Sequence, residues 1–129
     1  MRISHVALWS RNIDRLSDFY CRYFGARAGD TYVNAKKAFS SIFLRFDDAC
    51  SLELMQMDSV PENANDPDAQ YLGLIHLAIS IGSKDGVDAK TEELRGNGYT
   101  VVSEPRWTGD GYYESCVFDP DGNRIEITI

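Results

Sequence analysis

An internal repeat is the feature that most constrains what this chain can fold into. The same order of predicted elements, a strand, a helix and three further strands, occurs twice in succession. His5 matches His76 at a shift of 71 residues, and Glu53 matches Glu126 at a shift of 73. The shift changes only in turns, where insertions are tolerated. This repeat predicts two copies of one supersecondary unit.

The first copy shows clear patterns for each element. Its opening strand, residues 2–9, alternates so that Val6 and Leu8 face away from His5. Asn12 is the predicted N-cap of an amphipathic helix whose apolar residues recur every three or four positions, and Gly25 ends that helix. Three strands and one turn complete the copy: residues 27–33, 40–46 and 50–57, with the turn Asp47-Asp48-Ala49 before the last strand.

Residues 58–73 separate the copies and combine two prolines with acidic and small residues, so we expect an exposed linker. The second copy has a strand at 74–81, a helix capped by Ser83 or Asp85 and ended by Gly96-Asn97-Gly98, and strands at 99–104, 112–118 and 124–129. We therefore expect an α+β fold: two paired βαβββ modules, residues 1–57 and 74–129, in one structural domain.

Composition excludes several classes of function. The net charge of −7 argues against general binding to nucleic-acid phosphates. No apolar run is long enough to span a membrane, and the N-terminus lacks a signal-peptide pattern. The three cysteines are widely spaced and form no Cys-x-x-Cys pair, which indicates a reducing cytoplasm and neither a disulfide framework nor a zinc knuckle. We expect a cytoplasmic protein that acts on a small molecule.

In each copy the first strand carries a histidine and the last a glutamate, in the register opposite to the more apolar one. We therefore expect His5, Glu53, His76 and Glu126 on the sheet faces that no helix covers. Any one of them alone is ordinarily a solvated side chain. Both histidines of the chain, however, occupy equivalent positions of the repeat. If that face curves into a cup, the four side chains converge and can hold Zn²⁺, Ni²⁺, Co²⁺ or Mn²⁺.

Other side chains are candidates for contact with a substrate in such a cup. Small neighbours that leave room are Ser51, Ala78 and Ser80, and apolar walls are Trp9, Met55 and Met57. Residues 106–113 form a glycine-rich hairpin that either lines the substrate or pairs its aromatic residues across strands. Its candidate substrate contacts are Arg106, Trp107, Tyr112 and Tyr113. Cys50 and Cys116 fall on apolar strand positions, which predicts that they lie in the core.

The chain resembles the vicinal oxygen chelate superfamily, which includes glyoxalase I, extradiol dioxygenases, fosfomycin resistance enzymes, methylmalonyl-CoA epimerase and bleomycin resistance proteins. The resemblance covers the whole chain and is carried by Ile3-Ser4-His5-Val6-Ala7-Leu8, Phe19-Tyr20 to Phe24-Gly25, Leu52-Glu53-Leu54, Ile75-His76-Leu77-Ala78 and residues 119–126. It implies paired βαβββ modules whose curved mixed sheets form a cup. It also implies a homodimer whose cups lie within one chain or are shared between two.

Within that superfamily, the order His, Glu, His, Glu resembles the metal site of glyoxalase I. The resemblance implies one divalent metal per site (Ni, Zn, Co or Mn, with Fe disfavoured), held by His5, Glu53, His76 and Glu126. It further implies isomerisation of a hemithioacetal to a thioester through an enediolate. Glu126 would be the base, and Glu53 its partner or a static ligand.

Two other functions stay open at this point. The first is an Fe(II) ring-cleaving dioxygenase that uses two histidines and Glu126, against which the carboxylate of Glu53 speaks. The second is a non-enzymatic drug- or metabolite-binding protein whose aromatic residues hold the ligand. Trp9 stands where glyoxalase I enzymes usually place an arginine for glutathione. Arg11 with Lys36 or Lys37 either takes over that role or is ordinary surface charge, so the thiol substrate is left open.

Overall fold

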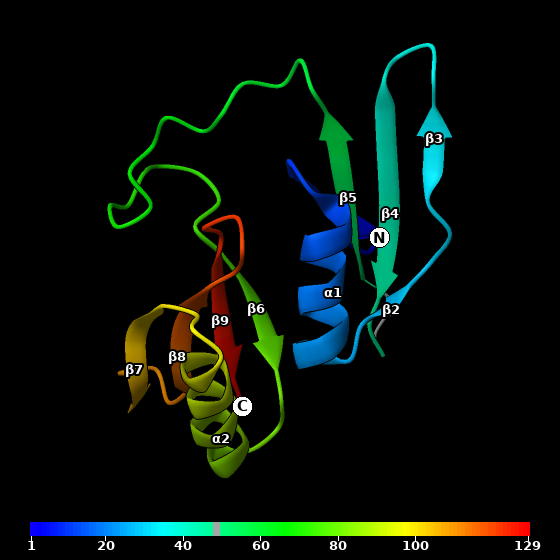
Figure 1. The fold of residues 1–129 in the computed structure, drawn as a ribbon. Helices are drawn as coiled ribbons and strands as arrows, with labels where there is room; N and C mark the ends of the chain where they lie inside the picture. The colour runs from blue at the N-terminus through cyan, green and yellow to red at the C-terminus, as the bar shows by residue number, and fades with distance from the viewer. Residues whose placement is uncertain (48–49) are drawn as a thin grey trace. The chain divides into compact units, whose positions relative to one another are not determined.

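The computed structural model of the chain describes residues 1–47 and 50–129, so Asp48 and Ala49 of the predicted turn lie outside the described residues. The described residues form two compact units, Met1–Asn63 and Ala64–Ile129. The first unit is coloured blue to green in Figure 1 and the second green to red. Each unit has one helix and one mixed sheet, so the fold is α+β with two βαβββ-like modules, as the repeat predicts.

The first unit contains β1 (His5–Trp9), α1 (Ile13–Phe24), β2 (Arg27–Ala28), β3 (Tyr32–Asn34), β4 (Phe39–Arg45) and β5 (Ser51–Met57). Its strand order is β1-β5-β4-β2, and β3 also pairs with β4. β1 runs parallel to β5, and the other pairings are antiparallel. α1 packs against β2, β4 and β5 (Figure 1). The opposite side of this sheet, its open face, carries no helix of the same described unit.

The core of the first unit lies between α1 and its sheet. The helix contributes apolar residues at the predicted three- and four-residue spacing, and the strands contribute the register that alternates with Glu53. The buried side chains are Ile13, Leu16, Phe19, Tyr20, Tyr23, Ile42, Leu44, Leu52 and Leu54. Asn12 caps the helix by accepting a hydrogen bond from the backbone N–H of Arg15 (2.9 Å), and Gly25, at φ 67°, ends it. Both predicted ends of α1 are confirmed.

The strand expected over residues 27–33 is divided into β2 and β3. Both parts pair with β4, with Ala28 opposite Leu44 and Tyr32 opposite Ser41. The path from Ala28 to Tyr32 is therefore one residue longer than the facing path on β4, which is the signature of a β-bulge. The Gly29 backbone N–H still donates to the carbonyl of Phe43 at 2.9 Å. The division is thus a local irregularity in one continuous edge of the sheet.

The second unit contains β6 (His76–Ser80), α2 (Lys84–Gly96), β7 (Val101–Trp107), β8 (Tyr113–Phe118) and β9 (Arg124–Thr128). Its strand order is β6-β9-β8-β7, with β6 parallel to β9 and the other pairings antiparallel. α2 packs against β7, β8 and β9, and the opposite side of the sheet is again an open face. The buried core is Val87, Leu94, Tyr113, Val117, Ile125 and Ile127. Ser83 is the N-cap, as predicted, and accepts from the Gly86 backbone N–H at 3.1 Å.

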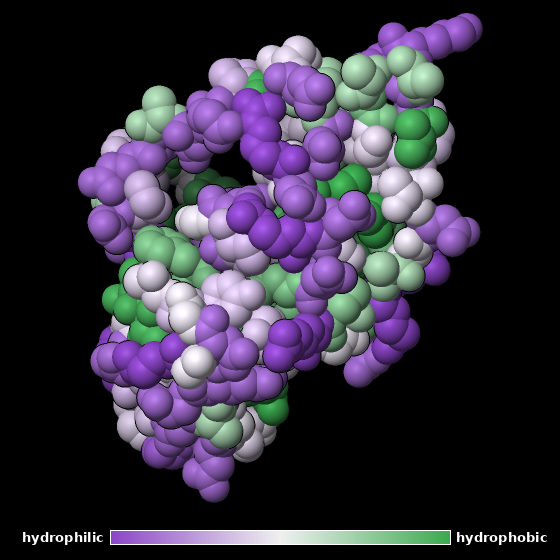
Figure 2. Space-filling model, viewed as in Figure 1, coloured by the Kyte–Doolittle hydropathy of each residue, from purple (hydrophilic) through white to green (hydrophobic). Residues whose placement is uncertain are grey.

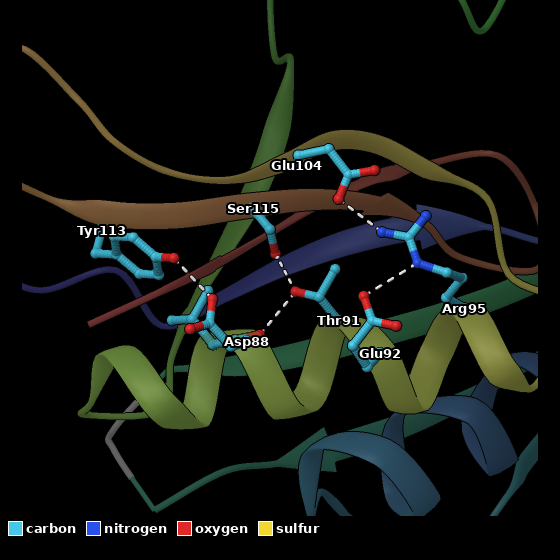
Figure 3. Close-up of polar contacts among 8 residues, drawn as sticks. Asp88, Thr91, Glu92, Arg95, Glu104, Tyr113 and Ser115 are labelled. Atoms are coloured by element: carbon cyan, nitrogen blue, oxygen red, sulfur yellow. Dashed lines mark hydrogen bonds and ion pairs between the residues drawn. The ribbon is translucent and has the colours of Figure 1, made fainter.

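Polar contacts tie α2 to its sheet along the whole helix (Figure 3). Near the first turn, the hydroxyl of Tyr113 donates to Asp88 at 2.7 Å. In the middle, the hydroxyls of Thr91 and Ser115 lie 2.7 Å apart, and both residues have no exposed surface. In the last turn, the guanidinium of Arg95 contacts Glu104 of β7 at 2.6 Å. These contacts fix which residues of β8 face the helix.

The turn before β9 is held by one buried carboxylate. Asp119, which is 4% exposed, accepts hydrogen bonds from the backbone N–H groups of Asp121 and Asn123, each at 2.9 Å. Gly122 adopts a φ of 82° in the same turn. This is the turn chemistry that Asp-Pro-Asp-Gly-Asn predicts, and it sets the start of the strand that carries Glu126.

Residues 58–75, all of which are described, form no helix or strand. They link β5 to β6 and contain the boundary between the two units. Hydrophilic residues cover most of this connector (Figure 2). Arg11 holds its first part through Glu62 (2.6 Å) and the carbonyl of Asp58 (3.2 Å). Arg124 holds a later part through the carbonyls of Pro67 (2.9 Å) and Asp68 (3.1 Å). Neither helix of the described chain is long and apolar enough to cross a membrane.

Candidate metal and substrate site

A histidine and a glutamate lie together on the open face of the first unit. β1 and β5 are parallel and place Ala7 opposite Glu53, so the side chain of His5 stands diagonally across from that carboxylate. The Nε2 atom of His5 lies 3.7 Å from Oε2 of Glu53. The imidazole is 43% exposed and the carboxylate 17%, so both groups are reachable from solvent.

The second unit repeats this pair in the same register. β6 and β9 place Ala78 opposite Glu126, and the Nε2 atom of His76 lies 3.5 Å from Oε2 of Glu126. The exposures, 39% and 18%, match those of the first pair. Ala7 and Ala78 stand opposite the two glutamates at matching positions. The two His–Glu pairs are therefore equivalent in strand pairing as well as in residue type.

Each pair has the spacing of two ligands on one cation. With metal–ligand distances of about 2.1 Å and tetrahedral angles, two donor atoms are separated by roughly 3.4 Å. The observed separations of 3.7 and 3.5 Å are close to that value. Among the described residues, no group of three or more His, Cys, Asp or Glu lies close enough to hold a metal ion. Each unit therefore presents one pair of donor atoms.

A second carboxylate, that of Glu114, lies near Glu126 and affects its pKa. Partial burial raises the pKa of the Glu126 carboxyl group, and repulsion and hydrogen bonding from Glu114 act in the same direction. The charges of His76 and Arg106 lower the pKa of Glu126. Glu114 itself stands on β8 opposite Thr128, and its Oε1 atom lies 3.5 Å from Nη2 of Arg106. Glu114 was not among the residues predicted from the sequence, because its place beside Glu126 depends on the pairing of β8 with β9.

Cys116 lies beside the candidate site and not in the core, which corrects the sequence-based expectation. It pairs with Glu126 in the β8–β9 register and is only partly buried. Burial is the main reason that the pKa of its thiol is raised, and the charge of Glu126 adds to that shift. Ser115 takes the core position instead, because its hydroxyl has a partner in Thr91. Cys50 is also only partly buried.

The predicted apolar residues of the first unit lie on the face that carries His5 and Glu53. Trp9 pairs with Met55, and Met57 pairs with Phe39. The indole ring of Trp9 meets Phe39 edge-on, with ring centroids 6.1 Å apart. A residue that the sequence analysis did not single out, Phe43, pairs with Glu53 and meets the imidazole of His5 edge-on at 5.5 Å.

The hairpin of the second unit divides its candidate substrate residues between two places. Arg106 lies on the open face with Glu114. Tyr113 lies on the other face: it is 7% exposed and its hydroxyl bonds to Asp88 of α2. Trp107 pairs with Tyr113 and contacts its ring at 5.2 Å. Of the two alternatives for this hairpin, Trp107 and Tyr113 therefore follow the pairing of aromatic residues across strands. Tyr112 is exposed in the turn between β7 and β8.

The small and basic candidates have simple positions. Ser51, Ala78 and Ser80 lie in register on the open faces: Ser51 opposite His5, and the other two opposite Glu126 and Thr128. Arg11 is engaged by the connector, through Glu62 and backbone carbonyls. Lys36 and Lys37 are exposed in the turn before β4. The position of Trp9 carries no cation, and the nearest basic candidate in sequence, Arg11, is already paired.

Two βαβββ-like modules with mixed sheets define the vicinal oxygen chelate class of folds, and the sequence comparison is consistent with that class. The profile of the Glyoxalase/Bleomycin resistance protein/Dioxygenase superfamily matches residues 2–127. The chain belongs to this superfamily. No curated protein sequence matches it.

Solved structures with the same fold include several glyoxalases. A glyoxalase family protein from Enterococcus faecalis is 26% identical, with a TM-score of 0.78 over 99% of this chain and 97% of that chain. A possible glyoxalase from Bacillus cereus is 26% identical, with a TM-score of 0.73 over 100% and 99%. Glyoxalase I from Zea mays is 22% identical, with a TM-score of 0.78 over 98% of this chain but 44% of that chain. The likeness to the maize enzyme shows the fold alone.

Proposed function

We propose that this protein is a metal-dependent enzyme of the glyoxalase I type. One divalent cation would be held by His5, Glu53, His76 and Glu126. The observation that carries this proposal is the repetition of one His–Glu pair, at the same register and nearly the same spacing, in both units. Imidazole and carboxylate donors suit Zn²⁺, Ni²⁺, Co²⁺ and Mn²⁺. The membership of the superfamily supports the same reading.

The proposed reaction moves one proton between neighbouring carbons. The metal, when bound, supplies a Lewis acid that polarises the oxygens of a hydroxy-carbonyl substrate. Glu126 takes the proton from the carbon that bears the hydroxyl group and returns it to the adjacent carbon, while the hydroxyl proton passes to the neighbouring oxygen. A hemithioacetal thus becomes a 2-hydroxy thioester without loss or gain of atoms. In the metal-free protein, burial and Glu114 raise the pKa of Glu126. Glu53, beside Phe43, is the proposed static ligand.

Calorimetric titration of metal-stripped protein with Ni²⁺ and Zn²⁺ tests the metal site. We expect one tight site per chain, lost in His5→Ala and in His76→Ala. Glu104→Gln is the matched control, because Glu104 is a strand glutamate that bonds to Arg95, away from either His–Glu pair. The control should bind metal as the native protein does. Absence of binding in the native protein would sink the catalytic proposal and leave a metabolite-binding module.

Activity measurements test the proposed role of Glu126 as the base. With a hemithioacetal substrate, Glu126→Gln should lower kcat by roughly 10²–10⁴-fold, the range typical of a lost general base. The rate is followed by thioester absorbance in the metal-loaded enzyme. A Glu126→Gln enzyme that binds metal and keeps native kcat would remove Glu126 from the role of base.

A further inference from the structure

Each open face carries a His–Glu pair, but the side chains around the two pairs differ. In the first unit, β1 and β5 pair Trp9 with Met55, whereas the equivalent pair on β6 and β9 is Ser80 with Thr128. On the neighbouring strand, Phe43 stands opposite Glu53 where Cys116 stands opposite Glu126. The first open face therefore has more aromatic side chains around its His–Glu pair than the second, whose open face carries Phe118 beside Arg124.

Four aromatic side chains lie on the first open face: Phe39 contacts the rings of Trp9 and Tyr32, and Phe43 contacts His5. The ring centroid of Phe39 lies 6.1 Å from that of Trp9 and 6.3 Å from that of Tyr32. Ser41 is flanked on β4 by Phe39 and Phe43 and pairs with both Met55 and Tyr32. We call this set, Trp9, Tyr32, Phe39, Phe43, Met55 and Met57, the aromatic cluster. Its rings keep large exposed surfaces: 44% of Trp9, 56% of Tyr32 and 38% of Phe43.

Folding of the first unit does not account for these exposed rings. The apolar core of the unit lies on the other side of the sheet, between the strands and α1. Edge-to-face aromatic pairs stabilise a sheet only modestly. Contiguous exposed apolar surface next to polar functional groups is instead typical of a ligand-binding site. Here the cluster is continuous with the pair His5–Glu53 through the ring contact between Phe43 and His5.

We propose that the aromatic cluster binds a planar aromatic group of the substrate. This inference rests on the proposed function and narrows its substrate to aryl-substituted hydroxy-carbonyl compounds. The cluster holds the aryl ring, while the oxygens of the substrate meet the His–Glu donors. Flat rings and the flexible methionines Met55 and Met57 suit a flat ligand surface, because methionine adapts its shape and contacts aromatic edges favourably.

The open face of the second unit carries a buried hydroxyl group beside Glu126. Thr128 is 9% exposed, and its Oγ1 atom is buried with no hydrogen-bond partner. It stands two residues beyond Glu126 on the same side of β9, opposite Glu114. A buried hydroxyl without a partner is destabilising unless an oxygen or nitrogen atom of a ligand or water bonds to it.

NMR signals of the methionine methyl groups test the aromatic cluster in metal-free protein. The chain has three methionines, Met1, Met55 and Met57, so labelling the methyl carbons gives two reporters in the cluster and one internal control at the N-terminus. Benzyl alcohol added to metal-free protein should shift the signals of Met55 and Met57 in a saturable way and leave Met1 unchanged. Cyclohexylmethanol, which has no aromatic ring, should produce at most a third of the shift.

Two variants make this experiment specific. Phe39→Ala removes the centre of the cluster and should weaken benzyl alcohol binding at least fivefold. Val33→Ala is the matched control, because Val33 is an exposed apolar residue of β3 that faces away from Tyr32. It should bind benzyl alcohol as the native protein does. Equal shifts of all three methionines, or no shift at all, would overturn the proposal.

Mandelate and lactate extend the test to the metal-loaded protein. Both carry the same hydroxy-carboxylate group, and only mandelate carries a phenyl ring. We expect mandelate to bind at least tenfold more tightly, and Phe39→Ala to reduce that preference to less than threefold. Equal affinity would overturn the substrate assignment even if metal binds. If metal does not bind but the methionine signals shift, the aromatic subsite stands and the proposed catalytic function falls.

Discussion

The hydroxyl of Thr91 is the single most constrained polar group between α2 and β8. Its Oγ1 atom donates to the carbonyl of Val87 at 2.7 Å, so its only hydrogen is used inside the helix. The contact of 2.7 Å with Ser115 must then be a bond that Ser115 donates and Thr91 accepts. Both residues are fully buried. The two hydroxyls are therefore not equivalent, although they share one hydrogen bond.

Substitutions at Thr91 and Ser115 should reveal this inequality. Thr91→Val leaves the buried hydroxyl of Ser115 without an acceptor, so we expect a loss of about 1–3 kcal/mol in the free energy of unfolding. Ser115→Ala leaves Thr91 bonded to Val87 and should lower stability by less, about 1 kcal/mol. Urea unfolding of each variant measures both values. The double variant should be more stable than Thr91→Val alone; a double variant that is less stable would contradict the assigned donor.

The contacts of single residues also explain why the sequence predicted a core position for Cys116. In β8, Cys116 and Phe118 look more apolar than Ser115, which favours them for the core. The structure buries Ser115 because Thr91 accepts its hydrogen bond, and that partner lies 24 residues away in sequence. A pattern of hydrophobicity does not contain such a partner. Tyr113 has a distant partner of the same kind, because Asp88 holds its hydroxyl against α2.

At the scale of elements, the helices follow the sequence closely because their ends are encoded locally. Asn12, Gly25 and Ser83 act through neighbours within a few residues, and all three were predicted. The strands are less predictable at their ends. β7 runs to Trp107, past Pro105, although the sequence suggested an end at residue 104. It is the edge strand of its sheet, where proline is tolerated, and its register shifts twice against β8.

Two glycines at helix ends should respond in opposite directions to the same substitution. Gly25 has a φ of 67°, and Gly25→Ala should lower the free energy of unfolding by about 1–2 kcal/mol, the strain of an L-residue in the left-handed region. Gly96 is the last residue of α2 and has no positive φ, and an added Cβ meets nothing within 4 Å. Gly96→Ala should raise stability by about 0.4–1 kcal/mol, because it reduces the freedom of the unfolded chain.

Thermal or urea unfolding of the two glycine variants, measured side by side, gives both numbers under one set of conditions. Neither glycine has a neighbour that an added Cβ would strike, so the difference between them isolates backbone conformation. Equal destabilisation by both substitutions would show that the end of α2 requires glycine for a reason other than φ.

For the whole molecule, the internal repeat carried most of what the sequence could predict. It located both His–Glu pairs, because strand pairing in each unit follows a period of two and the repeat fixes the register. It did not reveal Glu114 or Phe43, since both stand on neighbouring strands whose pairing depends on turn length. Cross-strand neighbours become visible only when the sheet order is known.

Metal binding should couple the two units in a measurable way. If one cation is held by ligands from both, Zn²⁺ at 100 times its Kd should raise the free energy of unfolding by about 2.7 kcal/mol, and a chelator should reverse the gain. His5→Ala and His76→Ala lie in different units, and each should abolish the effect. Unfolding followed by circular dichroism, with and without metal, provides the measurement. Stabilisation that survives His5→Ala would show that the second unit holds the metal alone.

The unequal open faces give this chain a particular evolutionary freedom. A duplicated module has two copies of every surface position, and here the copies have kept the His–Glu pair while their surroundings have diverged, as Trp9 and Ser80 illustrate. Selectivity for a new ligand can therefore change through mutations in the first half of the gene alone. Glu126, the proposed base, is encoded in the second half and need not change. In a repeat of this kind, ligand selectivity and the proposed acid–base chemistry can change through mutations in different copies.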